Sequence, residues 1–202
     1  GYANVHLGIP GGFTIYNALC ALGCAQALDI PLREAAEALV EAPGVKGRME
    51  VVPTPGPGTV IIDYAHTPDA VENVLRSVQE YAENRLICLF GCGGNRDAAK
   101  RPKMAQAAAK YADRLVVTSD NPRDENPDEI IREILTGLDD SSVPYDVVTD
   151  RREAIYHALK IAEKGDIIVL AGKGHEDYQI LEGNRHIHFD EREVVADGLK
   201  LL

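Results

Sequence analysis

The loop at residues 120–127 places an arginine, two asparagines and three carboxylates within eight positions. It follows the apolar run 115–118 and precedes a helical pattern, so we expect it at the carboxyl end of a strand, where open parallel sheets bind ligands. Arg123 can form a bidentate pair with a carboxylate, and an acidic side chain can accept an ammonium group. The loop therefore suits a small zwitterion. The alternative is an ordinary polar turn, because Asn-Pro pairs also mark turns.

Two further polar loops follow apolar runs. Residues 91–97 contain three glycines and Arg96, and residues 172–177 contain Gly172, His175 and Glu176. Glycines let the backbone approach a ligand, Arg96 can meet an anion, and Glu176 can accept an ammonium group. Neither loop has the spacing of a Walker or dinucleotide-binding motif. Each can also be a structural turn, but after parallel strands all three loops would converge on one rim of the sheet.

The segment 63–68 also follows an apolar run. Asp63 at a strand end can accept ribose hydroxyls, and His66 can contact phosphate. The alternative, which we favour from these residues alone, is that Asp63 or Thr67 caps the next helix. Asn17, inside an apolar helical pattern, needs a polar partner, and Arg48 stands at an expected domain boundary. Neither of them is diagnostic by itself.

Composition narrows the function classes. The chain has 202 residues, 45% of them apolar, and a net charge of −11. Such a charge disfavours nucleic acid as a general partner, and no apolar run approaches the roughly 18 residues of a membrane span. The four cysteines include no C-x-x-C pair, so zinc is not expected, and we interpret them as free, buried thiols of a cytoplasmic protein.

Periodicity predicts an α/β fold. Helices are expected at 13–28 and from Pro31 to about residue 40, with a Pro- and Gly-containing break at 43–47. Two strands, 49–52 and 59–62, should precede an alternation of helices and apolar strands. We expect helices at 68–83, 100–111, 127–138, 152–164 and 191–202, strands at 86–90, 115–118, 146–148 and 167–171, and a hairpin-like segment at 178–189. The predicted fold is a Rossmann-like domain with a mostly parallel sheet, residues 48–202, preceded by a short helical segment, residues 1–47.

No catalytic unit is visible in the sequence. It has no Ser/His/Asp signature, no G-x-S-x-G or H-E-x-x-H motif and no phosphate-binding P-loop. The residues alone predict a binding domain for an amino-acid-like zwitterion, with room for a nucleotide at its edge.

Six segments occur in an order that resembles the Mur ligases, and within them the branch that adds meso-diaminopimelate in peptidoglycan synthesis. They are residues 17–19, 47–50, 63–68, 90–97, 120–123 and 172–176. This resemblance covers essentially the whole chain. It implies an enzyme of three domains, which bind a UDP sugar, ATP and the incoming amino acid in turn.

The resemblance also implies roles for individual residues. The ATP-binding residues would be Asn17, Arg48, Asp63 and His66. The amino-acid-binding residues would be Arg96, Asp120, Asn121, Pro122, Arg123, Gly172 and Glu176. Arg123 would pair with the distal carboxylate of meso-diaminopimelate, which lysine lacks, so the site should reject lysine.

The reaction implied is ATP- and Mg²⁺-dependent amide formation through an acyl phosphate. This chain departs from the family's pattern because the P-loop, the Mg²⁺-binding residues, the modified lysine and the UDP-sugar domain are missing. They would lie upstream of Gly1. The expectation is a C-terminal domain with the last helices of the ATP-binding domain, a monomer unable to catalyse the ligation by itself. Its partners would be meso-diaminopimelate, ATP and, through the missing domains, UDP-N-acetylmuramoyl-dipeptide. The alternatives are a ligase fragment specific for lysine or another amino acid, and a non-catalytic binding module.

Overall fold

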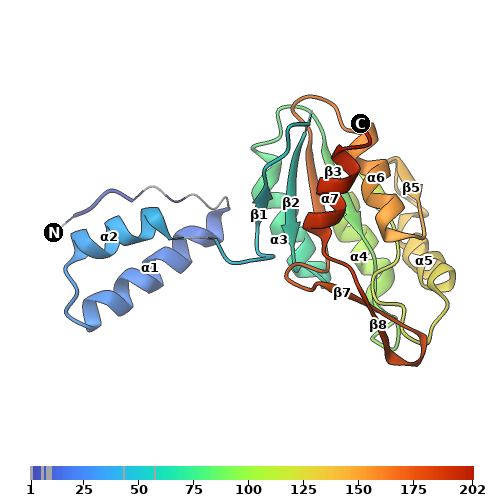
Figure 1. Ribbon diagram of the computed structural model, residues 1–202, viewed down its shortest axis with the longest axis horizontal. Helices are drawn as coiled ribbons and strands as arrows, with labels where there is room; N and C mark the ends of the chain where they lie inside the picture. The colour runs from blue at the N-terminus through green and yellow to red at the C-terminus, as the bar shows by residue number, and fades with distance from the viewer. Residues whose placement is uncertain (1, 6, 8–10, 43, 57) are drawn as a thin grey trace. The chain divides into compact units, whose positions relative to one another are not determined.

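The computed structural model describes residues 2–5, 7, 11–42, 44–56 and 58–202 (Figure 1). The chain divides into two compact units, Gly1–Val45 and Lys46–Leu202.

The described residues of the first unit form two helices, α1 (Gly12–Ala27) and α2 (Leu32–Glu41). Helix α1 ends in a turn in which Asp29 has a positive φ and the Ile30 amide donates to the Ala25 carbonyl. Pro31 then precedes α2, whose small residues Ala35 and Ala36 are buried. Cys20 and Cys24 are exposed on α1, contrary to the interpretation of them as buried, because α2 covers only part of the α1 surface.

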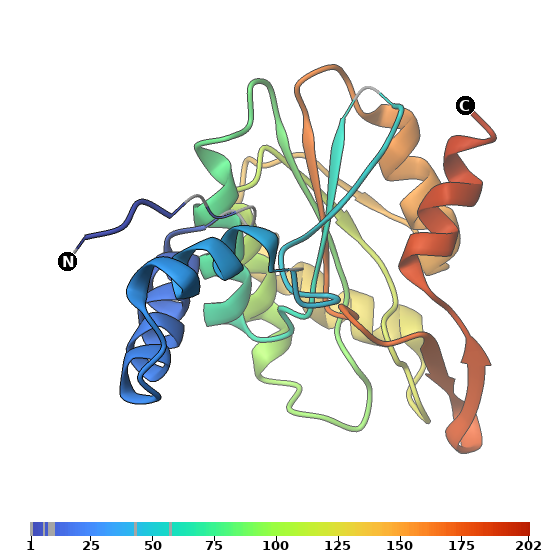
Figure 2. The same ribbon diagram turned by 60° about the vertical axis from the view of Figure 1, so that its left-hand side comes forward.

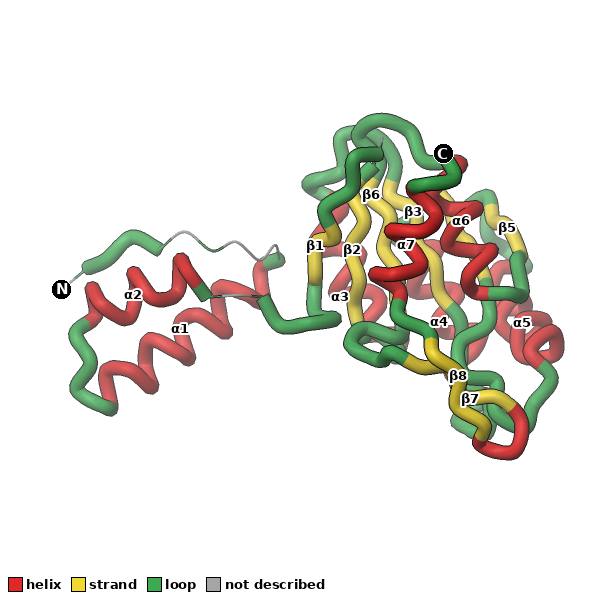
Figure 3. The backbone as a smooth tube through the Cα atoms, viewed as in Figure 1, coloured by secondary structure: helices red, strands yellow, loops and turns green. Residues whose placement is uncertain are grey.

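The second unit is built on a six-stranded sheet, as far as the described residues show (Figures 1 and 3). Its order is β1-β2-β6-β3-β4-β5, in which β1 is antiparallel to β2 and every other pair is parallel. The strands are β1 (Glu50–Val52), β2 (Thr59–Asp63), β3 (Leu86–Phe90), β4 (Arg114–Val117), β5 (Tyr145–Val147) and β6 (Ile167–Ala171). The prediction of a Rossmann-like, mostly parallel sheet is confirmed.

Helices cover both faces of the sheet (Figure 2). They are α3 (Pro68–Gln79), α4 (Lys100–Ala109), α5 (Pro127–Leu135), α6 (Arg151–Ile161) and α7 (Glu191–Leu199). Helices α6 and α7 pack on one face, where Ile155, Leu159 and Val194 meet buried sheet residues such as Ile87 and Leu170. Helices α3, α4 and α5 pack against one another on the other face. Two short 3₁₀ helices, η1 (Thr136–Leu138) and η2 (Glu182–Asn184), and a separate hairpin, β7 (Tyr178–Leu181) with β8 (Arg185–His188), complete the described part of this unit.

Several helices end earlier than their periodicity predicts. Helix α6 stops at Ile161, because Ala162 is extended and the Glu163 amide donates to the Asp166 carboxylate at 2.8 Å. Loop hydrogen bonds have there replaced the helical ones.

Asp166 joins three neighbouring strands at the edge of the sheet opposite the polar loops. It is 1% exposed, and its carboxylate accepts hydrogen bonds from Asn84 Nδ2 at 2.8 Å and Arg85 Nη2 at 2.7 Å. Its carbonyl accepts the Thr59 amide at 2.9 Å. Burial by itself raises the pKa of Asp166, but the hydrogen bonds from Arg85 and from the Glu163 amide outweigh it, so that the pKa lies below its ordinary value.

Asp166→Asn should therefore destabilise the protein by about 1–3 kcal/mol at neutral pH, because it removes a buried carboxylate that accepts several hydrogen bonds and leaves the half-buried Arg85 paired only with Glu163, at 3.3 Å. Since the folded pKa is lowered, this stabilisation is present above the unfolded pKa of about 4 and is lost as pH falls through the lower folded value. Urea unfolding of both proteins should show a gap at pH 7 that narrows below about pH 4. The exposed Asp139→Asn is the matched control, and a gap that is independent of pH would contradict the assignment.

Candidate functional site

The sheet order brings four polar loops to one edge. Strands β2, β6, β3 and β4 are consecutive neighbours, and all four are parallel. Their carboxyl ends are followed by residues 63–68, 172–177, 91–97 and 118–127 respectively. Between these loops lies a cavity of about 320 Å³. It is lined by Tyr64, His66, Thr67, Gly93, Arg96, Asp97, Lys100, Asp120, Asn121, Arg123, Gly172 and Glu176.

Seven of the residues singled out in the sequence thus share one cavity: His66, Arg96, Asp120, Asn121, Arg123, Gly172 and Glu176. Pro122 is buried and does not line it. Its carbonyl oxygen would lie only 1.9 Å from a Cβ placed on Gly94. The Gly94 amide also donates to the Asn121 carbonyl at 2.9 Å. The loops after β3 and β4 are therefore interlocked through their backbones.

Arg123 is half-buried and held by the backbone around it. Its φ is +53°, and its amide donates to the Ile180 carbonyl at 3.1 Å. Its Nη1 donates to the carbonyls of Gly94 at 3.0 Å and Asn121 at 3.4 Å. Among the described residues, these side-chain hydrogen bonds use Nη1, so Nη2 and Nε remain to bind a carboxylate. Arg96, which is exposed, donates to the Asn95 carbonyl at 3.0 Å.

The acidic side of the cavity is more deeply buried. Asp120 and Asn121 are 7% and 5% exposed. Asn121 Nδ2 donates to Glu176 Oε2 at 3.0 Å. Gly172 has a φ of +121°, and a Cβ there would lie 3.2 Å from Asp120 Oδ2. Glycine thus allows the loop after β6 to pass close to the Asp120 carboxylate.

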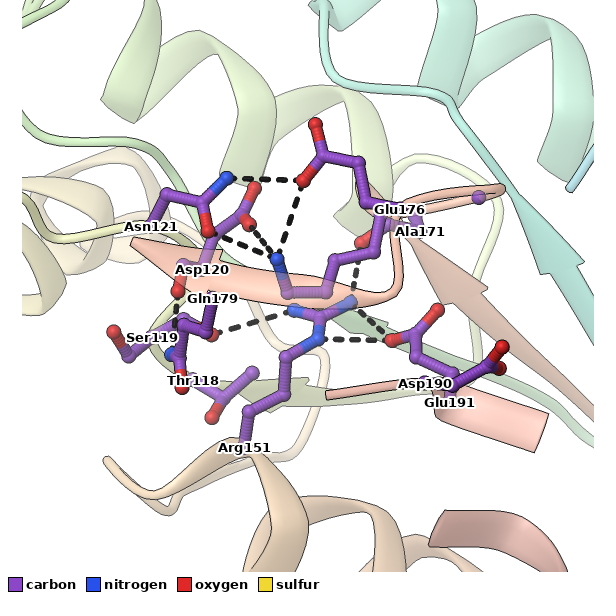
Figure 4. A network of polar contacts seen from close by, with 12 residues as sticks. Thr118, Ser119, Asp120, Asn121, Arg151, Ala171, Glu176, Gln179, Asp190 and Glu191 are labelled. Carbon is purple, nitrogen blue, oxygen red and sulfur yellow. Dashed lines mark hydrogen bonds and ion pairs between the residues drawn. The ribbon is translucent and has the colours of Figure 1, made fainter. Parts of the chain in front are cut away.

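Two buried cations near these residues, Lys173 and Arg151, had no role in the sequence analysis; Figure 4 labels Arg151. Lys173 is fully buried, and its Nζ lies 2.9 Å from Asn121 Oδ1 and 3.3 Å from both Asp120 Oδ1 and Glu176 Oε2. Arg151 donates to the Ala171 carbonyl at 2.9 Å and pairs with the buried Glu191 at 2.8 Å. The sequence feature that could have indicated a buried Lys173 is its position two residues after the end of a wholly apolar strand, between two glycines.

The residues expected to bind ATP divide between the units. Asn17 is exposed on α1 in the first unit. In the second unit, the Arg48 guanidinium lies 4.9 Å from the centre of the Tyr64 ring, and the Tyr64 ring lies 4.7 Å from that of His66. Asp63 is buried at the end of β2 and accepts the Met49 amide at 2.8 Å. Arg48, Asp63 and His66 are thus gathered around the end of β2.

The structure decides which of Thr67 and Asp63 caps helix α3. Thr67 Oγ1 accepts the Ala70 amide at 3.3 Å and is the N-cap of α3, whereas Asp63 bonds to Met49 instead. Burial raises the pKa of Asp63, and the Met49 and Ala65 amides offset this only partly.

Metal ligands, reactive thiols and long apolar helices can each be looked for among the residues that the structure describes. They contain no group of three or more His, Cys, Asp or Glu side chains placed to hold a metal ion. Cys88 and Cys92 are buried, which raises the pKa of each thiol to about 12 and makes both inert. None of the described helices is both long and apolar enough to cross a bilayer.

Comparisons with known proteins agree with the motifs. Residues 47–174 match the family described as Mur ligase, glutamate ligase domain. The chain is 53% identical over 195 residues to the UDP-N-acetylmuramoyl-L-alanyl-D-glutamate--2,6-diaminopimelate ligase of Caldanaerobacter subterraneus subsp. tengcongensis, covering 96% of this chain and 40% of that protein. It is 47% identical to the enzyme of the same name from Clostridioides difficile, again covering 96% and 40%.

Solved structures show the same relationship. A structure of a UDP-N-acetylmuramoyl-L-alanyl-D-glutamate--2,6-diaminopimelate ligase superposes with a TM-score of 0.77 at 38% identity, covering 98% of this chain and 40% of the other. UDP-N-acetylmuramate-alanine ligase from Thermotoga maritima superposes with a TM-score of 0.67 at 26% identity, covering 87% and 37%. The chain spans about 40% of the length of the curated relatives that it matches. With its motifs, sheet and polar edge in agreement, the chain belongs to the Mur ligase family.

Proposed function

We propose that this chain is the amino-acid-binding, C-terminal part of an ATP-dependent ligase that adds meso-diaminopimelate to UDP-N-acetylmuramoyl-L-alanyl-D-glutamate. The observation that carries the proposal is the cavity at the carboxyl edge of the sheet, which presents guanidinium groups and carboxylates to the same space. The names of the relatives support the choice of substrate.

The charges in the cavity match those of the ligand. Meso-diaminopimelate carries a carboxylate and an ammonium group at each end. The free nitrogens of Arg123 would pair with the distal carboxylate, and Arg96, at the exposed rim, would meet the other one. Glu176 and Asp120 would accept an ammonium group, with Asn121 and Gly172 shaping the wall between them. Lysine has no distal carboxylate, so it would leave Arg123 unpaired.

ATP would meet this chain around the end of β2. Arg48 would contribute positive charge, Asp63 would accept ribose hydroxyls, and His66, which lines the cavity, would contact a phosphate. Asn17 would contact the base from the first unit. When bound, ATP supplies the phosphoryl group that activates the acceptor carboxylate. The described residues do not form a Mg²⁺ site, so we assign that ion no ligand here.

We assign residues 1–47 to the end of the ATP-binding domain and residues 48–202 to the amino-acid-binding domain. The relatives are about two and a half times as long as this chain, because the chain covers 40% of them. UDP-N-acetylmuramoyl-dipeptide would bind the parts of those proteins that lie outside the matched segment. The chain by itself should therefore bind the amino acid without catalysing ligation.

Isothermal titration of the chain with meso-diaminopimelate, and with L-lysine as control, tests this function. We expect meso-diaminopimelate to bind at least about a hundredfold more tightly, since a site built for a polar group strongly rejects an analogue that lacks it. With ATP and the UDP-linked dipeptide added, the chain should release no phosphate. Equal affinity for the two amino acids, or heat from neither, would contradict the assignment of a selective site to this chain.

A further inference from the structure

Lys173 is buried directly beneath the amino-acid pocket but does not line it. Its Nζ donates three hydrogen bonds: to Asn121 Oδ1 at 2.9 Å, to the Tyr178 carbonyl at 2.8 Å and to Glu176 Oε2 at 3.3 Å. An ammonium group has three N–H donors, so all of them are used. Asp120 Oδ1 lies at 3.3 Å as an ion-pair contact and is a buried oxygen without a hydrogen bond among the described residues.

These contacts determine how the Asn121 amide points. Its Oδ1 accepts from two donors, Lys173 Nζ and the Ile180 amide at 3.0 Å, so this atom must be the oxygen. Nδ2 is therefore the atom that faces Glu176 Oε2, at 3.0 Å. The second N–H of Asn121 remains for a ligand carboxylate.

The two carboxylate oxygens of Glu176 differ in their hydrogen-bond partners. Oε2 accepts from both Asn121 Nδ2 and Lys173 Nζ, whereas none of the hydrogen bonds found among the described residues involves Oε1. Glu176 is also attached through its backbone, because its amide donates to the Lys173 carbonyl at 2.9 Å. One oxygen of this carboxylate is thus held inside the protein and the other is left for an ammonium group.

Lys173 also balances the charge of two largely buried carboxylates. Asp120 and Glu176 side chains are only 10% and 13% exposed, and both face the same ammonium (Figure 4). The rings of Tyr178 and Phe189 lie 6.0 Å from Nζ and cover it. Without this cation, the carboxylates of Asp120 and Glu176 and the amide oxygen of Asn121 would surround a cavity of the size of an alkylammonium ion, and their buried negative charge would be uncompensated.

We propose that Lys173 is the positioning residue of the amino-acid pocket: its ammonium group orients the Asn121 amide and occupies Oε2 of Glu176, so that Glu176 presents one oxygen to the substrate's ammonium group. This inference rests on the proposed function and deepens it. Lys173 touches no ligand itself and acts through Asn121, Asp120 and Glu176.

The test uses Lys173→Ala in the whole chain, with n-propylammonium and 1-propanol as added probes. The variant should bind meso-diaminopimelate on the order of ten- to hundredfold more weakly, the loss seen when outer partners of a binding residue are removed. Propylammonium, which replaces the deleted atoms and their charge, should restore binding, whereas the neutral alcohol should not. Restoration by both probes equally would mean that Lys173 only fills space, and an unchanged affinity would also overturn the proposal.

A second measurement does not depend on the amino acid. In the ¹H–¹⁵N spectrum of the wild-type chain, the Lys173 ammonium protons should exchange slowly, and one Asn121 amide proton should be protected. Lys173→Met, which retains the chain length without the donors, should abolish that protection. Rapid exchange of these signals in the wild type would reject the role of Lys173. Absence of meso-diaminopimelate binding with slow exchange would reject only the proposed substrate, so the two failures are distinguishable.

Discussion

Replacing Arg123 by alanine should weaken meso-diaminopimelate binding by on the order of a hundredfold or more, while L-lysine binding should change little. Nη1 of this guanidinium donates hydrogen bonds to the Gly94 and Asn121 carbonyls. These bonds fix the orientation of the guanidinium, so that Nη2 and Nε are already placed to bind a carboxylate. The distal carboxylate that pairs with these nitrogens is present in diaminopimelate and absent from lysine. The loss should therefore fall on one ligand and not on the other.

The measurement is titration calorimetry of each variant with both amino acids. Arg123→Lys should recover only part of the affinity, because an ammonium group cannot form the bidentate pair. Arg132→Ala is the matched control, since Arg132 lies on α5 with 65% of its side chain exposed and does not line the cavity. If Arg123→Ala weakened binding of both amino acids equally, Arg123 would have a structural role and would not recognise the distal carboxylate.

Gly94→Ala should destabilise the second unit by about 3 kcal/mol or more and should also remove amino-acid binding. The added Cβ would lie 1.9 Å from the Pro122 carbonyl oxygen and 2.8 Å from its carbon. Both are backbone atoms that no rotamer change can move. The two loops would have to separate, which would break the hydrogen bond from the Gly94 amide to Asn121 and displace Arg123.

Urea unfolding and meso-diaminopimelate titration of the same variant measure the two effects together. Gly23→Ala is the control, because among the described atoms nothing lies within 4 Å of the added Cβ. In the middle of α1 it should be neutral or stabilising by up to about 1 kcal/mol. Normal stability and normal binding of Gly94→Ala would show that the loops after β3 and β4 are not interlocked as described.

Some elements were predictable because their local and tertiary preferences agree. Strands β3 and β6 have the predicted bounds, Leu86–Phe90 and Ile167–Ala171, since an unbroken apolar run buried on both faces admits little else. Helices α3 and α5 begin at the predicted prolines, each after a side-chain cap, Thr67 or Asn126. Helix ends were less predictable: α6 stops where the carboxylate of Asp166, which is held by Asn84 and Arg85 just before β3, accepts the Glu163 amide.

The candidate site was predictable as a set of residue types but not as a geometry. The order of polar loops after apolar strands indicated that Arg96, Arg123 and Glu176 lie on one edge, because parallel strands share a carboxyl end. The insertion of β6 between β2 and β3 brings Gly172 against Asp63, whose carbonyl accepts the Gly172 amide at 3.0 Å. No local sequence feature of either segment predicts that Gly172 and Asp63 are neighbours.

The sequence by itself determined the fold class, the family and the charged groups available to a ligand, since periodicity, turn chemistry and short motifs are local properties of the chain. Only the tertiary structure decided which of those groups face the cavity and which lie beneath it. Nothing in the local sequence assigned a role to Lys173 or Arg151, and both are buried. Burial makes such a charge depend on carboxylates and carbonyls from distant strands, and the close approach of those strands is a property of packing.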